Sequence, residues 1–185
     1  MRYIIIQILK RLYSGEGKPV LVLTTEFGGG KTHTLLLVYH VLKDKVKGLE
    51  YLKHYEIDKE LAITDLPDVY LASIDYRRLL GKITLWGEIA RQLNMYNKVK
   101  KYDQEKLPPN VDILTELFSD KPVLLLIDEF YNYVFDAQEK VGNKTLGEIT
   151  INFILNLMAV ISNTKKECDI INVDRRTGSL STRSQ

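Results

Sequence analysis

The sequence predicts an α/β fold in which a parallel β-sheet carries helices on both faces. Residues 20–24 and 122–127 are short, unbroken apolar runs, and such runs are typical of strands that are buried on both faces. Residues 68–75 read as a further strand. Amphipathic segments separate these runs, and strands that alternate with helices usually build a parallel sheet.

The first half of the chain begins with a predicted helix over residues 3–13, for which a strand is the alternative because the apolar residues are nearly continuous. Glycines and a proline mark residues 14–19 as a loop before the first strand. An amphipathic helix is then expected from Lys31 to Lys47, ended by Gly48. Residues 49–67 are polar and irregular and suggest one weak helix at most.

The second half contains two helices with recognisable caps. Thr84 is the expected cap of a helix over residues 84–93, and Asn110 the expected cap of a helix that ends at Phe118. The Lys- and Tyr-rich residues 94–109 are interpreted as a surface connection. The remaining expected segments are a helix over residues 147–163, a short strand over residues 170–173 and a loose polar tail over residues 174–185.

Composition limits the classes of protein to which the chain can belong. A length of 185 residues with 45% hydrophobic residues suits one domain, here residues 1–173 followed by the tail. A formal net charge of +2 is too small to indicate a nucleic-acid binder. The single cysteine, Cys168, favours a reducing compartment, and a segment of ~18 uninterrupted apolar residues is lacking. We therefore expect a cytoplasmic protein without a membrane span.

The most informative segment is a glycine-rich turn between the first strand and the following amphipathic helix. Glycines allow successive backbone N–H groups to point at phosphate oxygens, and the helix start adds a positive dipole end. In such a phosphate-binding loop Lys31 would reach the β- and γ-phosphates, and the Thr32 hydroxyl would ligate Mg²⁺. The candidate nucleotide-binding residues are Phe27, Gly28, Gly29, Gly30, Lys31, Thr32 and His33.

The loop departs from the usual G-x-x-x-x-G-K-[ST] pattern at one position. Thr25 stands where the first glycine is expected, so Gly28 and Gly29 would supply the flexibility instead. A glycine-rich loop with an incidental lysine is the alternative interpretation, which the flanking strand and helix disfavour.

A second element, residues 123–129, consists of apolar residues that end in an acidic pair. This is the pattern of a Walker B strand, in which Asp128 would hold Mg²⁺ through its water ligands and Glu129 would act as the general base for the attacking water. A buried strand followed by a helix-capping acid is the alternative. Both segments end at the carboxyl edge of a parallel sheet, where ligands bind in α/β folds, and the acid directly after the aspartate points to ATPases with an additional strand and a catalytic glutamate.

These motifs resemble those of a known family. Residues 27–35 are similar to the Walker A region, residues 84–93 to a second signature, and residues 125–130 with Tyr133 to the Walker B region of predicted AAA+-like P-loop ATPases of archaea and bacteria, known as domain of unknown function family 499. The three motifs occur in the same order and cover about residues 20–135.

The resemblance to these AAA+-like proteins implies ATP binding and leaves hydrolysis open. Proteins of this family are longer and are expected to continue into sensor strands, an arginine finger and a helical lid, so the resemblance implies a core that is incomplete at its C-terminus. It also suggests an association with mobile genetic elements or phage defence, and it implies no substrate beyond the nucleotide.

Several other residues carry both a functional and a purely structural interpretation. His33 would contact phosphate or pack on the sheet, and Asn172 would be a sensor residue or a turn residue. Arg77 and Arg78 would act in a second subunit or lie in solvent. Trp86 is predicted as a core or interface anchor, and Cys168 as a buried thiol. A basic and aromatic stretch is predicted as a solvated loop, with contact to nucleic acid as the alternative; its residues are Lys98, Lys100 and Lys101 with Tyr96 and Tyr102.

The sequence thus predicts a Mg-ATP-binding P-loop protein with Lys31 and Glu129 as catalytic residues and Thr32 and Asp128 as metal ligands. ATP hydrolysis is an open question. The alternatives are a truncated module that binds nucleotide or a partner without turnover, and a nucleic-acid-associated motor or defence subunit. Expected partners are the nucleotide, and a second copy of the chain or a downstream ATPase fragment.

Overall fold

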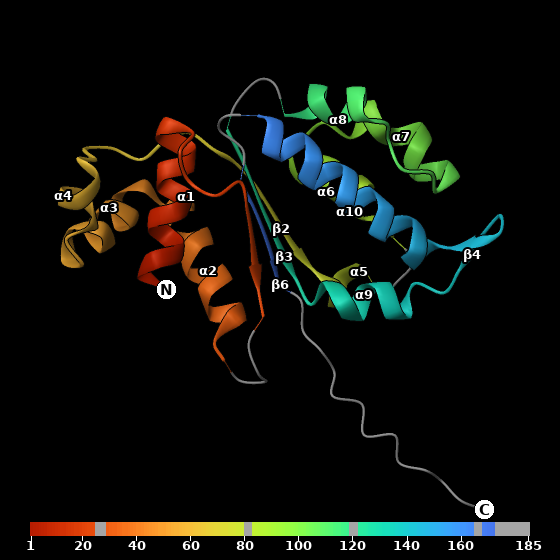
Figure 1. The fold of residues 1–185 in the computed structure, drawn as a ribbon, viewed down its shortest axis with the longest axis horizontal. Helices are drawn as coiled ribbons and strands as arrows, with labels where there is room; N and C mark the ends of the chain where they lie inside the picture. The colour runs from red at the N-terminus through yellow and green to blue at the C-terminus, as the bar shows by residue number, and fades with distance from the viewer. Residues whose placement is uncertain (25–28, 80–82, 119–121, 165–167, 173–185) are drawn as a thin grey trace, which may run out of the picture.

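The structure is a computed structural model that describes residues 1–24, 29–79, 83–118, 122–164 and 168–172. In this part of the chain, helices and parallel strands form a mixed α/β fold. A four-stranded sheet stands between two groups of helices, so that the predicted arrangement of helices on both faces is observed (Figure 1).

The sheet is parallel, and its strands follow the order β1-β6-β3-β2. The register pairs Leu23 of β1 with Asn172 of β6, and Asp75 of β2 with Asp128 of β3. The carboxyl ends of these strands therefore meet at one edge of the sheet. Strand β6, the last strand among the described residues, lies between β1 and β3. The strands are β1 (Val20–Leu23), β2 (Tyr70–Asp75), β3 (Val123–Asp128) and β6 (Cys168–Asn172).

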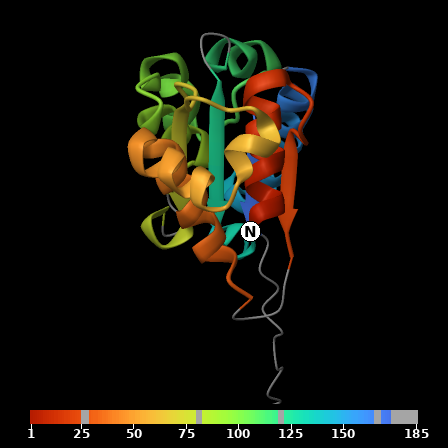
Figure 2. The ribbon, with the colours of Figure 1, turned by 90° about the vertical axis from the view of Figure 1, so that its left-hand side faces the viewer.

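One face of the sheet is covered by the N-terminal helices, which form one core with Leu124 and Leu126 of β3 (Figure 2). Alternate residues of a strand point to opposite faces, so these two leucines share a face. The helices are α1 (Arg2–Ser14), α2 (Lys31–Lys43), α3 (Lys45–His54) and α4 (Ile57–Leu61).

The other face carries a second core, which contains Val123, Leu125 and Ile127 of β3. Trp86 is buried in this core against Phe153, with ring centroids 5.3 Å apart, which confirms its predicted role as a core anchor. The elements on this side are α5 (Tyr76–Leu79), α6 (Leu85–Gln92), α7 (Tyr96–Glu105), α8 (Val111–Leu117), α9 (Phe130–Asp136), the hairpin of β4 (Lys140–Val141) and β5 (Lys144–Thr145), and α10 (Leu146–Asn163).

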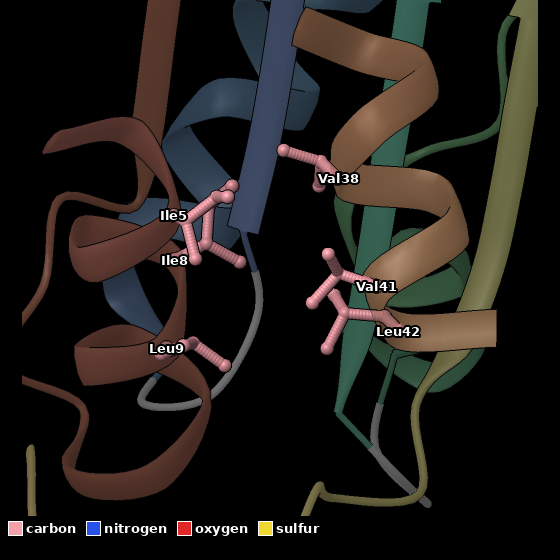
Figure 3. A pocket seen from close by; sticks show the side chains of 6 residues that line it. All are labelled: Ile5, Ile8, Leu9, Val38, Val41 and Leu42. Carbon is pink, nitrogen blue, oxygen red and sulfur yellow. The ribbon is translucent and has the colours of Figure 1, made fainter. Parts of the chain in front are cut away.

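A small apolar gap lies between α1 and α2 (Figure 3). Its volume of about 10 Å³ is at the lower limit for one water molecule, and no polar side chain lines it. It is therefore a packing gap within the core and offers no room for a ligand. The lining residues are Ile5, Ile8, Leu9, Val38, Val41 and Leu42.

The predicted single helix from Lys31 to Lys47 is wrong, because the chain breaks at Asp44 into α2 and α3. The Asp44 carboxylate accepts a hydrogen bond from the Lys47 backbone N–H and so caps a new helix. Gly48 is inside α3, where a side chain would collide with the Val41 carbonyl oxygen of α2. The glycine therefore permits close packing of two helices and does not end the first one.

The predicted surface connection over residues 94–109 is also wrong, since α7 occupies most of it. One face of α7 buries Val99 completely and places the Asp103 carboxylate against Thr84 and Arg91 of α6 and its cap. Tertiary contacts thus stabilise a segment whose composition is mostly polar. The predicted tail, residues 174–185, lies outside the described residues.

Helix α10 is 18 residues long and apolar enough, with a mean hydropathy of 1.3, to meet the length and composition criteria for a membrane span. Half of it is buried inside the protein, and its inner side includes Phe153 and Leu157 of the second core. A core helix has the same composition, so this helix is weak evidence for a span.

Candidate functional site

The helix that follows the glycine-rich segment begins at Lys31, at the carboxyl edge of the sheet. Gly30 precedes it with φ of 74°, a left-handed conformation that glycine adopts without strain. Its carbonyl oxygen accepts both the backbone N–H and the hydroxyl of Thr34, at 2.9 and 3.0 Å. Lys31 is 7% exposed at this first turn. Phe27 and Gly28 lie outside the described residues, and Gly29 is exposed.

The second predicted element, at the end of β3, meets this helix start directly. The Thr32 hydroxyl donates a hydrogen bond to Oδ2 of Asp128 at 2.9 Å. The other carboxylate oxygen, Oδ1, accepts the Glu129 backbone N–H at 3.0 Å. Two residues that are 96 positions apart in the chain are therefore in contact, as the two motifs together predict.

Glu129 connects β3 to α9 and has φ of 53°, in the left-handed region. That conformation costs a residue with a side chain roughly 1 kcal/mol, and such strain is often found at functional sites. The Glu129 carbonyl oxygen accepts the backbone N–H of Asn132, and its carboxylate oxygen Oε2 accepts the Asn132 side-chain amide at 3.2 Å. The candidate base is thus held by the helix that it precedes.

Asn132 was not predicted as a functional residue from the sequence. It is 8% exposed and lies on the first turn of α9. The signal that could have revealed it is its spacing, because a residue three positions after Glu129 on a helix faces the same side.

The donor set at this edge suits a hard divalent cation. Hydroxyl and carboxylate oxygens are the ligands that Mg²⁺ prefers, and Mg²⁺ usually takes only one or two protein ligands beside water and phosphate oxygens. Thr32 Oγ1 and Asp128 Oδ2 provide such a pair, 2.9 Å apart. Within the described residues no group of three or more His, Cys, Asp or Glu side chains could hold a metal by itself.

The other predicted site residues have varied positions. His33 is exposed on the first turn of α2. Asn172 is the last residue of β6, level with Leu23 of β1, as expected for a sensor position, although its side chain is not among those described. The same holds for the side chains of Cys168, Arg77 and Arg78.

The basic stretch predicted as a solvated loop belongs to α7, and part of it is engaged within the protein. The Lys98 ammonium pairs with Glu116 at 2.9 Å, and the Tyr96 hydroxyl donates to Asp103 at 2.8 Å. These contacts reduce the basic character that contact with nucleic acid would require.

The signature over residues 84–93 has a structural role in the fold. Thr84 caps α6 as predicted, accepting the Gly87 backbone N–H at 3.1 Å. The Asp103 carboxylate of α7 accepts hydrogen bonds from Thr84 and Arg91. A side chain at Gly87 would occupy the space of that carboxylate. The glycine thus lets α7 lie close to α6.

The end of the same signature protects an edge of the sheet. Strand β2 is an edge strand, and Gln92 bonds to its Ser73 through both amide atoms. Gln92 Oε1 accepts the Ser73 N–H at 2.8 Å, and Gln92 Nε2 donates to the Ser73 carbonyl oxygen at 3.0 Å. This side chain satisfies backbone groups that would otherwise be open to pairing with another strand.

Comparisons with known proteins identify the family of the chain. The family model of the DUF499 N-terminal domain matches residues 1–70 and 77–185. No curated protein and no solved structure matches the chain.

Proposed function

The chain belongs to the DUF499 N-terminal domain family, and we propose that it is a Mg-ATP-binding P-loop protein of AAA+-like type. The observation that carries this proposal is the 2.9 Å hydrogen bond between the Thr32 hydroxyl and Asp128. It brings the two sequence motifs, predicted independently for phosphate and for metal, to one point at the carboxyl edge of a parallel sheet.

The strand order gives further support. Strand β6 lies between β1, which leads to the glycine-rich segment, and β3, which ends in Asp128. A further strand between these two fits the class of ATPases with an additional strand and a catalytic glutamate, to which the acidic pair of Asp128 and Glu129 points.

In the proposed site, the amide groups that precede α2 and the Lys31 ammonium bind phosphate oxygens. Thr32 and Asp128 would hold Mg²⁺. When bound, the cation would neutralise phosphate charge. Glu129 accepts the proton of the attacking water through its carboxylate.

A second candidate function is a nucleotide-binding module without turnover. The three arginines whose side chains are described are engaged elsewhere: Arg2 pairs with Glu60, Arg11 bonds to backbone carbonyl groups, and Arg91 bonds to Asp103. Within these described residues, no arginine is placed as a charge-stabilising finger at the site. An arginine finger, if turnover uses one, would come from the arginines of this chain whose side chains are not described or from a second copy of the chain.

Thermal unfolding with and without Mg-ATP tests the binding proposal. A ligand that binds only the folded state raises its stability, so Mg-ATP is expected to raise the melting temperature of the wild type and to leave that of Lys31→Ala unchanged. The exposed Lys43→Ala on the last turn of α2 is the matched control and should keep the full shift. If millimolar Mg-ATP leaves the melting temperature of the wild type unchanged, nucleotide binding is contradicted.

Turnover by the wild type and by Glu129→Gln separates the two candidate functions. The ATPase is supported if Glu129→Gln releases phosphate more slowly than the wild type but keeps the rise in melting temperature with Mg-ATP. A retained shift without phosphate release above background in either protein supports the binding module.

A further inference from the structure

Two hydrogen bonds join Asn132 to Glu129. Its backbone N–H donates to the Glu129 carbonyl oxygen at 3.0 Å, and its side-chain Nδ2 donates to Glu129 Oε2 at 3.2 Å. Because a carboxylate only accepts hydrogen bonds, the Asn132 amide must present its nitrogen to Glu129. The two residues are one helical turn apart, so the contact forms without any rearrangement of the fold.

The other polar atom of the Asn132 side-chain amide is its oxygen, Oδ1. This atom is buried and has no hydrogen-bond partner among the described residues, and the side chain is 8% exposed. A buried acceptor without a partner is unfavourable, and an apolar residue of similar size avoids that penalty. Stability of the fold alone therefore does not account for an amide at this position, whereas its donor to Glu129 does.

We propose that Asn132 is a positioning residue that holds the Glu129 carboxylate in the orientation for proton acceptance, an inference that rests on the proposed ATPase function. The Glu129 backbone is already fixed by its N–H bond to Asp128 and by the left-handed conformation. The amide of Asn132 restrains the remaining freedom, which is rotation of the side chain. Without this donor the carboxylate samples more orientations, and the rate of the chemical step falls.

The nucleotide-binding residues should be unaffected by a change at this position. Lys31 and Thr32 belong to α2 on one side of the sheet, while Asn132 belongs to α9 on the other. Loss of the amide should therefore lower kcat and leave KM and the Mg-ATP-induced melting shift unchanged.

The experiment compares Asn132→Leu with the wild type and with Asn156→Leu, a matched change at an exposed asparagine of α10. Hydrogen bonds to charged groups correspond to a roughly 10- to 100-fold effect, so we expect kcat to fall by about that factor in Asn132→Leu only. The apo melting temperature should change little, because loss of the hydrogen bond to Glu129 is offset by removal of the buried unpaired oxygen. Asn132→Ala removes the donor and the unpaired oxygen without placing a charge beside Glu129, and it serves as the second variant if the leucine variant does not fold.

A double-mutant cycle with Glu129→Gln tests whether Asn132 acts through Glu129. If it does, Asn132→Leu has no further effect on phosphate release in the Glu129→Gln background. An equal fall in kcat in both backgrounds overturns the inference. An unchanged kcat in Asn132→Leu and Asn132→Ala also overturns it, as does loss of the Mg-ATP-induced melting shift in both variants.

The outcomes also separate this inference from the function on which it rests. A wild type without a Mg-ATP shift contradicts nucleotide binding itself. A wild type that shows the shift but releases no phosphate overturns the positioning role and leaves nucleotide binding intact.

Discussion

The replacement Asp128→Asn tests whether the contact between α2 and β3 is a metal site. In the folded protein the two Asp128 oxygens have separate partners, since Oδ1 accepts the Glu129 N–H and Oδ2 accepts the Thr32 hydroxyl. An asparagine keeps the first bond through its oxygen, and its amide nitrogen can donate to the Thr32 oxygen. The apo protein should therefore lose less than about 1 kcal/mol of stability.

The effect on ligand binding should be much larger. At a ligand concentration of about 100 times the Kd, Mg-ATP stabilises the wild type by roughly 2.7 kcal/mol, which corresponds to a melting shift of about 5–11 °C for a domain of this size. Loss of a residue that orients a metal ligand typically costs a factor of ~10–100 in metal affinity. At the upper value the ligand concentration equals the new Kd, and the stabilisation falls to about 0.4 kcal/mol, or roughly 1–2 °C.

The assay is thermal unfolding of wild type, Asp128→Asn and Asp112→Asn, each without ligand, with Mg-ATP, and with ATP and EDTA. Asp112 is an exposed aspartate of α8, which lies at the opposite end of the sheet from α9 in Figure 1, and its variant should keep the full shift. EDTA should reduce the wild-type shift to about that of Asp128→Asn. A full Mg-ATP shift in Asp128→Asn would refute the assignment of Asp128 to the metal.

Three further predictions concern the stability of the fold. Gly87→Ala places a methyl group 2.7 Å from the Thr84 hydroxyl oxygen and against Asp103. It should therefore lower the melting temperature by roughly 2–12 °C, and an unchanged melting temperature would contradict the close packing of α6 and α7. Arg11→Leu removes the donors to the Gly15 and Ile161 carbonyl groups at 2.8 and 3.1 Å and should cost about 3 kcal/mol in urea unfolding, with Lys10→Leu, an exposed neighbour, as control. Burial raises the pKa of Tyr133 to about 12, so the neutral phenol contributes stability below pH ~10 that is lost as the pH rises through about 12. In Tyr133→Phe the free energy of unfolding should therefore depend less on pH between these values. An equal dependence on pH in the wild type and the variant would contradict this contribution of Tyr133.

Local signals in the sequence are sufficient to predict the helices whose ends are fixed by their own side chains. Thr84 and Asn110 were predicted as helix caps, and each accepts a backbone N–H from three residues ahead. The buried strands were equally clear, because β3 contributes residues to the cores on both faces and so needs an unbroken apolar run. Asp44 is a cap of the same kind, but the apolar periodicity continues on both sides of it and therefore predicts one uninterrupted helix.

The elements that were missed depend on contacts between distant segments. Helix α7 has few apolar residues, and its position is set by Asp103, which lies against Thr84 and Arg91 of a neighbouring helix. No property of residues 94–109 by themselves encodes that contact. The meeting of Thr32 and Asp128 was predictable despite its range, because the carboxyl ends of parallel strands converge at one edge of a sheet. For Asn132 the sequence offers only its spacing from Glu129, because its burial and its unpaired oxygen are evident only in three dimensions.

The position of the proposed site relative to the two cores has a mechanical consequence. Helix α2, with Lys31 and Thr32, packs in the core on one face of the sheet, and α9, which Glu129 precedes, packs in the core on the other. The hydrogen bond from Thr32 to Asp128 joins the two sides at the carboxyl edge. Mg-ATP held by Lys31, Thr32 and Asp128 would add several charged contacts at this point. Under the proposed function, binding would therefore strengthen the link between the two sides, and release of phosphate would weaken it.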